Sequence, residues 1–134
     1  MDKKKEIYKE LLSFAEKAAE NSYSPYSKFA VGAAVLCGDG KVYCGTNIEN
    51  ASYGLSMCAE RVAVFTAVAN GAENIKAVAV YSSSGNVTPC GACRQVISEF
   101  AQKADIVYKD KNNKIKIEKI NSLLPKCFDK KSLK

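Results

Sequence analysis

The spacing of apolar side chains along the chain predicts helices and strands in the order α-β-β-α-β-α-β-β. Apolar residues recur every three or four positions between residues 3 and 20, which predicts an amphipathic helix. Further helices are expected from about Cys58 to Val68, and from just after Pro89 to about Lys103. Short apolar or alternating runs predict five strands, at residues 29–37, 41–44, 75–81, 105–108 and 114–119.

The connections between these strands predict a mixed sheet. Gly38-Asp39-Gly40 joins the first two strands in a hairpin, and the polar turn 109–113 joins the last two, so both pairs are expected to be antiparallel. The strand, helix and strand between residues 75 and 108 instead predict a parallel crossover. We therefore expect an α/β fold in which helices cover the faces of a mixed sheet. Because there is no internal repeat or linker, residues 1–134 are expected to form one domain, long enough to bury a core.

The composition is that of an ordinary globular protein, with 47% hydrophobic and 25% charged residues. The net charge of +6 comes from lysines spread along the chain, with short runs at 3–5 and 130–131. This distribution indicates a solvated surface, so neither nucleic acid nor a membrane is expected as a partner. No segment has the pattern of a signal peptide or the length of a membrane span, and a cytoplasmic location is expected. In a reducing compartment the six cysteines are expected as metal ligands, nucleophiles or core residues rather than disulfides.

Two cysteine-containing segments lie where a polar loop becomes a helix, Cys58-Ala-Glu-Arg61 and Pro89-Cys-Gly-Ala-Cys-Arg94. Cys90 and Cys93 are three residues apart, so their sulfurs can share one face of a first helical turn. The partial positive charge of a helix N-terminus favours thiolates there. This pair alone fits a redox motif as well as a metal site, but Cys58 at the start of another helix favours the metal.

Three thiolates in a chain without histidine predict a catalytic zinc site. Structural zinc sites are closed by four protein ligands, whereas catalytic sites keep one position open for water. The alternative is a structural site whose fourth ligand is a carboxylate or another cysteine: Cys37, Cys44 or Cys127. Two of these, Cys37 and Cys44, lie in apolar strand contexts, where buried inert thiols are common. The expected ligands of one zinc ion per chain are Cys58, Cys90 and Cys93.

Three charged residues beside these cysteines are candidates for the chemistry. Glu60 follows Cys58 by two positions, and non-helical geometry at a helix start can turn both side chains toward one metal. A carboxylate there can take a proton from activated water and give it to a leaving group. The alternative for Glu60 is a first-turn residue stabilised by the helix dipole. Zinc with three thiolates carries a net charge of −1, so Arg61 and Arg94 are expected to donate hydrogen bonds to the sulfurs and compensate that charge.

The motifs extend beyond the cysteines, and together they resemble the short, homotetrameric, zinc-dependent cytidine deaminases. The resemblance covers roughly residues 5–128 and rests on Ser24-Pro-Tyr-Ser-Lys-Phe29, Val31-Gly-Ala-Ala34, Gly45-Thr-Asn-Ile-Glu-Asn-Ala51, Cys58-Ala-Glu-Arg61 and Pro89-Cys-Gly-Ala-Cys-Arg-Gln95. Zinc nucleobase deaminases carry an H-x-E…P-C-x-x-C signature, and Cys58 stands where that signature has histidine. The resemblance implies a three-layer α/β/α sandwich with a mixed five-stranded sheet and zinc at two helix N-termini.

The activity implied by the resemblance is zinc-dependent hydrolysis of free cytidine and deoxycytidine to uridine and deoxyuridine, as in pyrimidine salvage. Hydroxide formed at the zinc would attack C4 of the ring, while Glu60 accepts the proton and delivers it to N3. One alternative is a deaminase of another small aminopyrimidine or nucleoside-like compound with the same metal chemistry. Another is a non-catalytic, zinc-stabilised module that binds nucleic acid, but such a module has no use for Glu60 beside an open metal.

The resemblance also implies which residues bind the substrate. Asn47 and Glu49 would hydrogen-bond the ribose hydroxyls, and Phe29 and Ala59 would lie against the nucleoside. Other contacts would reach a neighbouring subunit in a homotetramer with composite active sites, and they come from Ala51, Tyr53 and Phe128. The alternative for Phe128 is a core residue at a helix end.

Overall fold

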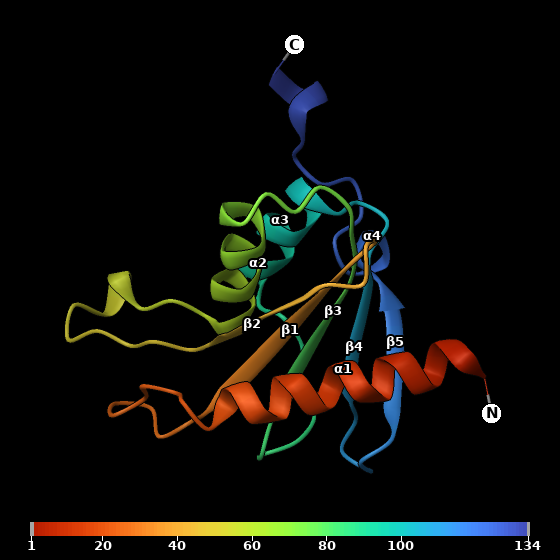
Figure 1. Cartoon of the computed structure of the whole chain (residues 1–134). Coiled ribbons are helices and arrows are strands. Elements are labelled where there is room, and N and C mark those ends of the chain that lie inside the picture. The colour runs from red at the N-terminus through yellow and green to blue at the C-terminus, as the bar shows by residue number, and fades with distance from the viewer. Residues whose placement is uncertain (1, 134) are drawn as a thin grey trace.

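A computed structural model describes residues 2–133 of the chain (Figure 1). In that range the helices are α1 (Lys3–Ala19), α2 (Ala59–Ala69), α3 (Gly91–Phe100) and α4 (Ile120–Leu123), with short 3₁₀ helices η1 (Tyr53–Leu55) and η2 (Lys130–Leu133). The strands are β1 (Val31–Cys37), β2 (Val42–Thr46), β3 (Ile75–Ser82), β4 (Asp105–Lys109) and β5 (Ile115–Lys119). None of the helices within residues 2–133 combines the length and the apolar character that crossing a membrane requires.

The five strands form one sheet in the order β2-β1-β3-β4-β5. Strand β1 runs antiparallel to both β2 and β3, and β4 runs antiparallel to β5. Strands β3 and β4 are parallel, and α3 lies in the connection between them. The prediction of a mixed five-stranded sheet is therefore confirmed.

Helices cover both faces of this sheet, with α1 on one face and α2 and α3 on the other (Figure 1). The core under α1 joins Leu11 and Ala15 to Ala34 of β1 and Ala79 of β3. The core on the other face joins the second pair of helices to the same strands, through Ala63, Val64, Ile97, Val35 and Val78. Because β1 and β3 are buried on both faces, their sequences are nearly continuous apolar runs. The expected three-layer α/β/α sandwich is confirmed.

Two glycines allow helices to approach the sheet closely. A Cβ atom at Gly32 of β1 would lie 1.8 Å from the carbonyl oxygen of Ala15 in α1. A Cβ atom at Gly45 of β2 would lie 2.4 Å from the backbone nitrogen of Ala63 in α2. Any side chain at either position would push the helix away from the sheet. The contact at Gly45 therefore sets the position of α2, and with it that of Cys58 just before the first turn.

The end of one helix and the presence of another differ from the sequence prediction. Helix α3 ends at Phe100 rather than near Lys103, because Ala101 leaves helical geometry with φ −155° and ψ 66°. The sequence did not predict α4, a helix of four residues. Its Ile120 is fully buried, and the Ile120 N–H donates to the carbonyl oxygen of Ala104 at 3.0 Å. Burial of this single side chain leaves no helical period in the sequence, so the pattern of apolar residues could not predict α4.

A buried carboxylate connects α1 to the sheet. Asp105 at the start of β4 is only 4% exposed and accepts a hydrogen bond from the Tyr8 hydroxyl at 2.7 Å. It also forms ion pairs with Lys119 at 2.8 Å and with Lys4 at 3.0 Å. Burial by itself would raise the pKa of this carboxyl, but the three partners outweigh burial and hold the pKa below its ordinary value. The ionised carboxylate is therefore the form that stabilises the folded state.

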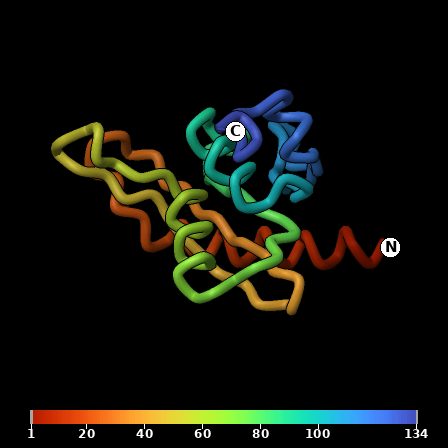
Figure 2. The backbone as a smooth tube through the Cα atoms, turned by 90° about the horizontal axis from the view of Figure 1, so that it is seen from above, coloured from red at the N-terminus to blue at the C-terminus, as the bar shows by residue number. Residues whose placement is uncertain are grey.

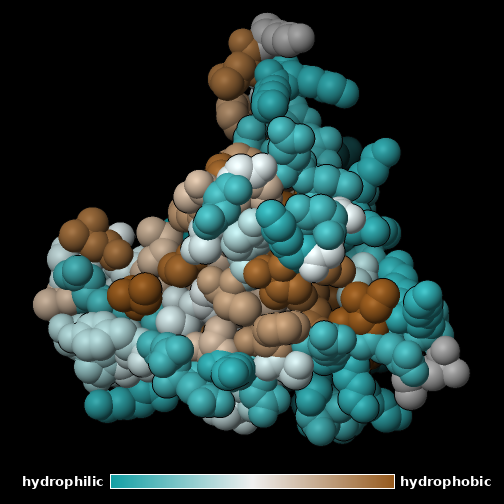
Figure 3. All heavy atoms as spheres, in the orientation of Figure 1, coloured by the Kyte–Doolittle hydropathy of each residue, from teal (hydrophilic) through white to brown (hydrophobic). Residues whose placement is uncertain are grey.

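Residues 20–30 and 47–57 run side by side and project from the body of the molecule (Figures 1 and 2). We call these two segments the arm. Isolated bridges pair Ile48 with Tyr23 and with Met57, so the polar loop expected at 47–57 is tied to the first segment. Apolar side chains on the arm face outward, with Tyr53 74% and Leu55 68% exposed. Figure 3 shows brown, hydrophobic patches on the arm and at the centre of the same face.

Candidate metal centre

The three predicted cysteine ligands meet where α2 and α3 begin. Cys58 immediately precedes α2, Cys90 immediately precedes α3, and Cys93 lies in the first turn of α3. Cys58 and Cys90 both have extended backbone geometry, and neither side chain caps its helix by a hydrogen bond. The two helix N-termini thus direct partial positive charge toward the sulfurs, which favours thiolates.

The spacing of the three sulfurs fits a zinc ion. The Sγ atoms lie within 4.8 Å of one another, and those of Cys58 and Cys90 are 3.8 Å apart. Two tetrahedral ligands at a Zn–S distance of about 2.3 Å are themselves about 3.8 Å apart. Within residues 2–133 no fourth cysteine, aspartate or glutamate joins this group. The donor set therefore fits a zinc ion that keeps one position open, and the alternative of a closed four-ligand site finds no support.

The three thiols differ in acidity. The neighbouring side chain of Cys93, followed by those of Arg61 and Cys90, lowers the pKa of Cys58 to about 5 despite burial. The neighbouring sulfur of Cys58, together with burial and the nearby carboxylate of Glu60, raises the pKa of Cys93. One sulfur therefore ionises readily, whereas ionisation of all three needs a cation among them.

Glu60 is a buried carboxyl beside this group. It lies in the first turn of α2, is 4% exposed, and is close enough to Cys93 for each group to affect the pKa of the other. Burial raises the pKa of Glu60 to about 7, and the negative charge of Cys58 adds to the rise. Its own backbone N–H and the charge of Arg61 oppose this rise. A carboxyl with this pKa can both gain and lose a proton near neutral pH.

Arg61 lies where charge compensation was expected. Its Nη2 donates to the Sγ of Cys58 at 3.4 Å. The hydrogen bond to Cys58 and the negative charge of that sulfur raise the pKa of the guanidinium, so it stays positively charged although partly buried. The Nε of Arg61 is buried and has no hydrogen-bond partner in the described part of the chain.

Arg94 differs from its prediction. Its Nε donates to the carbonyl oxygen of Pro89 at 2.8 Å, and its Nη1 donates to the carbonyl oxygen of Leu123 at 3.0 Å. Across residues 2–133 no hydrogen bond joins Arg94 to a cysteine sulfur. Successive helical side chains point about 100° apart. Because Cys93 faces the core, the side chain of Arg94 turns instead toward residues 120–128, which we call the C-terminal segment.

Asn47, a predicted ribose contact, holds the base of the arm together. Its Nδ2 donates to the carbonyl oxygen of Phe29 at 2.7 Å, and its Oδ1 accepts from the N–H of Val31 at 3.0 Å. The hydroxyl of Ser22 also donates to this oxygen. One Nδ2 proton remains for a ligand. These bonds also place Phe29, the predicted nucleoside contact, beside Asn47.

Glu49, the other predicted ribose contact, accepts hydrogen bonds from the first segment of the arm. The donors are the N–H groups of Tyr26 at 3.0 Å and Ser27 at 3.1 Å, and the hydroxyl of Ser27. The Ser27 hydroxyl contributes most to lowering the pKa of Glu49. Glu49, these two residues, Tyr53 and Ser56 line a hollow of about 340 Å³. The sequence missed Ser27, because a turn-rich segment predicts a loop but not which distant side chain the loop contacts.

The remaining predicted substrate contacts are dispersed over one chain. Ala59 is fully buried at the start of α2, next to Cys58. Ala51 and Tyr53 are exposed on the arm, and Phe128 is 59% exposed on the C-terminal segment. This exposure argues against the alternative of Phe128 as a core residue. The arm and the C-terminal segment lie apart in both Figure 1 and Figure 2.

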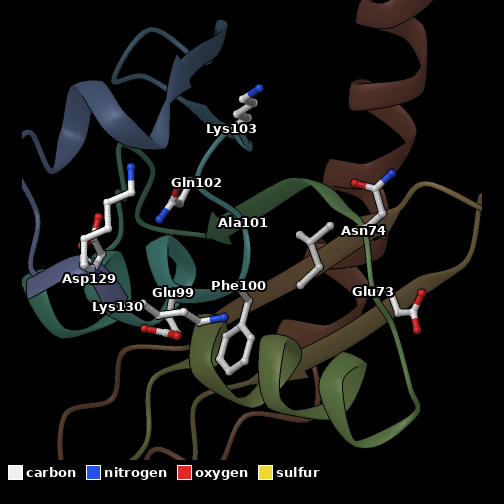
Figure 4. Close-up of a pocket in the computed structure, with 11 residues that line it drawn as sticks. Glu73, Asn74, Glu99, Phe100, Ala101, Gln102, Lys103, Asp129 and Lys130 are labelled. Carbon is white, nitrogen blue, oxygen red and sulfur yellow. Dashed lines mark hydrogen bonds between the residues drawn. The ribbon is translucent and has the colours of Figure 1, made fainter. Parts of the chain in front are cut away.

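A separate hollow of about 470 Å³ lies at the C-terminal end of α3 (Figure 4). Its walls include Glu73, Asn74, Phe100 and Lys103, and none of the clustered cysteines lines it. The acidic side chains labelled in Figure 4 come from separate segments and do not converge on one point. The candidate site is therefore the cysteine group and not this hollow.

Known proteins with a similar sequence and fold include cytidine deaminases. The family model described as the cytidine and deoxycytidylate deaminase zinc-binding region matches residues 5–109. A cytidine deaminase of Sporosarcina psychrophila is 49% identical over 126 residues, which are 92% of this chain and 92% of that protein. One of Halalkalibacterium halodurans is 46% identical over 120 residues, 88% of this chain and 91% of that protein. The crystal structure of cytidine deaminase from Burkholderia pseudomallei is 43% identical, with a TM-score of 0.84 over 90% of this chain and 98% of that one.

Proposed function

The chain belongs to the zinc-binding cytidine and deoxycytidylate deaminase family, and we propose that it hydrolyses free cytidine and deoxycytidine to uridine and deoxyuridine with release of ammonia. The observation that carries the proposal is the group of three sulfurs at two helix N-termini, with the buried carboxyl of Glu60 against it. A metal site with one open position beside a group that exchanges protons near neutral pH suits hydrolysis.

Cys58, Cys90 and Cys93 would hold one zinc ion per chain. When bound, zinc lowers the pKa of a water molecule from 15.7 to about 7, which supplies a nucleophile at neutral pH. The two helix N-termini and the guanidinium of Arg61 offset the negative charge of three thiolates.

Glu60 moves the protons of the reaction. It accepts a proton from the attacking water as the new C4–O bond forms, and it donates that proton to N3 of the ring. It then transfers the second proton of the water to the C4 amino group, so that the C4–N bond breaks and ammonia leaves. Burial raises the pKa of Glu60 above that of an exposed carboxyl, which suits a group that must gain and lose a proton in turn.

The arm supports a free nucleoside as the substrate. Glu49 and Asn47 would bind the ribose hydroxyls, and the hollow that Glu49 lines would accept the sugar. Phe29 and Ala59 would lie against the nucleoside. The negative charge of Glu49 disfavours a phosphate at this position, which argues against nucleotides and polynucleotides.

The exposed apolar side chains of the arm support assembly into a homotetramer. Tyr53 and Leu55 would be buried between subunits rather than left in water. In such an assembly, Ala51, Tyr53 and Phe128 of one subunit would complete the active site of a neighbour. Composite sites account for the dispersal of these residues over a single chain.

Residues 1–134 would act as one catalytic domain that takes part in pyrimidine salvage. All six cysteines are free thiols, which fits a reducing compartment and supports a cytoplasmic location.

The test is the loss of ultraviolet absorbance when cytidine is added to the zinc-loaded protein. We expect turnover that stops after zinc is removed with a chelator and returns when zinc is added back. Zinc-loaded protein that leaves cytidine and deoxycytidine unchanged would refute the proposal. Turnover of a different aminopyrimidine alone would assign the site to that compound instead.

A further inference from the structure

The C-terminal segment is held against α3 by three side chains of that helix. Arg94 donates from Nη1 to the carbonyl oxygen of Leu123 at 3.0 Å. Gln95 donates from Nε2 to the carbonyl oxygen of Phe128 at 2.8 Å, and the Ser98 hydroxyl is hydrogen-bonded to the thiol of Cys127 at 3.1 Å. We call these three contacts the tether.

Arg94 connects the tether to a metal ligand. Its Nε donates to the carbonyl oxygen of Pro89, the residue before Cys90, at 2.8 Å. Because the peptide group is planar, the carbonyl of Pro89 and the backbone nitrogen of Cys90 move together. Arg94 directly follows Cys93, and its guanidinium therefore holds the backbone at both Cys90 and Leu123.

The C-terminal segment depends on such contacts for its conformation. Ile120 anchors its start in the core, where it is fully buried. After Pro125 the chain reverses through Lys126, whose φ of 52° lies in the left-handed region that residues other than glycine disfavour. A residue keeps this conformation when its surroundings impose it. The contacts of Cys127 and Phe128 with α3 directly follow the reversal.

We propose that Arg94 is a positioning residue that couples the C-terminal segment to zinc retention by holding Cys90 and α3 in place. Both acceptors of Arg94 are neutral backbone carbonyls, so its role depends on the fixed plane of the guanidinium rather than on charge alone. Lysine keeps the charge but cannot donate in two fixed directions. The inference rests on the proposed zinc site and not on the identity of the substrate.

The test uses the Arg94→Lys variant of the full, zinc-loaded chain, with two measurements. Transfer of zinc to a chromogenic chelator should show an affinity about 10–100-fold lower than that of the parent, as for other residues that orient metal ligands. Amide hydrogen exchange should become faster across residues 120–128, because the tether has lost one of its three contacts. The matched control is Arg61→Lys, which alters the contact with the Cys58 sulfur and should weaken zinc binding without faster exchange at 120–128.

A double variant, Gln95→Leu with Ser98→Ala, tests the coupling from the other side. It removes two contacts of the tether and leaves Arg94 and all three sulfurs unchanged. Faster exchange at 120–128 together with faster zinc release would support the coupling. Parental zinc retention in either variant, or zinc loss from Arg94→Lys with unchanged exchange at 120–128, would overturn it. If both variants lose zinc as expected but the parent chain leaves cytidine unchanged, the proposed function is refuted and the coupling is not.

Discussion

Arg61 donates a hydrogen bond to the sulfur of Cys58 at 3.4 Å, across the first turn of α2. The bond places a permanent positive charge against a thiol whose pKa is lowered to about 5. The two residues are three positions apart, so one helix start brings both side chains together. The proposed metal ligand and its counter-charge are therefore positioned by the same local structure.

Replacing Arg61 by glutamine should weaken zinc binding while leaving the fold intact. Glutamine keeps a hydrogen-bond donor but removes the charge, and loss of such a partner typically costs about 10–100-fold in metal affinity. Competition with a chelator of known affinity measures the change. Parental affinity in this variant would show that the two helix N-termini are sufficient to stabilise the thiolates.

Replacing Cys90 by serine should remove zinc, because a neutral hydroxyl is a poor substitute for a thiolate ligand. Elemental analysis of the purified protein should find about one zinc per chain in the parent and almost none in Cys90→Ser. The matched control is Cys44→Ser, also an exposed cysteine, which lies outside the group of three sulfurs and should keep full occupancy. Full occupancy in Cys90→Ser would disprove the ligand assignment.

The Asp105→Asn variant should be less stable than the parent by about 1–3 kcal/mol at neutral pH. Asparagine removes the negative charge and replaces one acceptor oxygen with an NH₂ group, which cannot accept from Tyr8, Lys4 or Lys119. The folded-state pKa of Asp105 is lowered, so the ionised carboxylate adds stability above the unfolded pKa of about 3.9. That stability is lost as the pH falls through the lower, folded-state pKa. Denaturant unfolding should therefore show a difference between parent and variant that shrinks below about pH 4. The control is Glu73→Gln, at an exposed position, and its free energy of unfolding should stay within about 0.5 kcal/mol of the parent. An equal loss of stability in both variants would contradict the role of Asp105.

The sequence predicts most of the fold because its patterns are local. The helical period before Ala19 and the apolar runs of β1 and β3 each identify an element without reference to the rest of the chain. The helix starts at Cys58 and Cys90 also follow from local signals, and their meeting follows once both are recognised as ligands of one metal.

The parts that the sequence did not predict depend on distant partners. The acceptors of Arg94 and Gln95 are backbone carbonyls at Leu123 and Phe128, which carry no side-chain signal. Helix α4 is too short for a helical period, and it forms because its first residue is buried. Charge reasoning directed both arginines to the sulfurs, whereas the helix geometry directs Arg94 elsewhere.

The proposed assembly predicts that a charge on the arm disrupts both the oligomer and the activity. Leu55→Lys places a charged side chain where an apolar one is 68% exposed in the single chain. In a homotetramer this side chain would be buried, so the substitution should shift sedimentation toward smaller species and reduce cytidine turnover together. A parent chain that sediments as a fully active monomer would contradict the composite sites.

Glu60→Gln tests the central claim, that a buried carboxyl beside three zinc-binding thiolates moves the protons of cytidine hydrolysis. Glutamine preserves the size of the side chain but cannot accept a proton, so the variant should keep its fold and about one zinc per chain. General acid–base catalysis typically contributes about 10²–10⁴-fold. The account predicts that turnover of cytidine falls by at least about 10²-fold in this zinc-loaded variant. Turnover within about tenfold of the parent, at equal zinc occupancy, would contradict it.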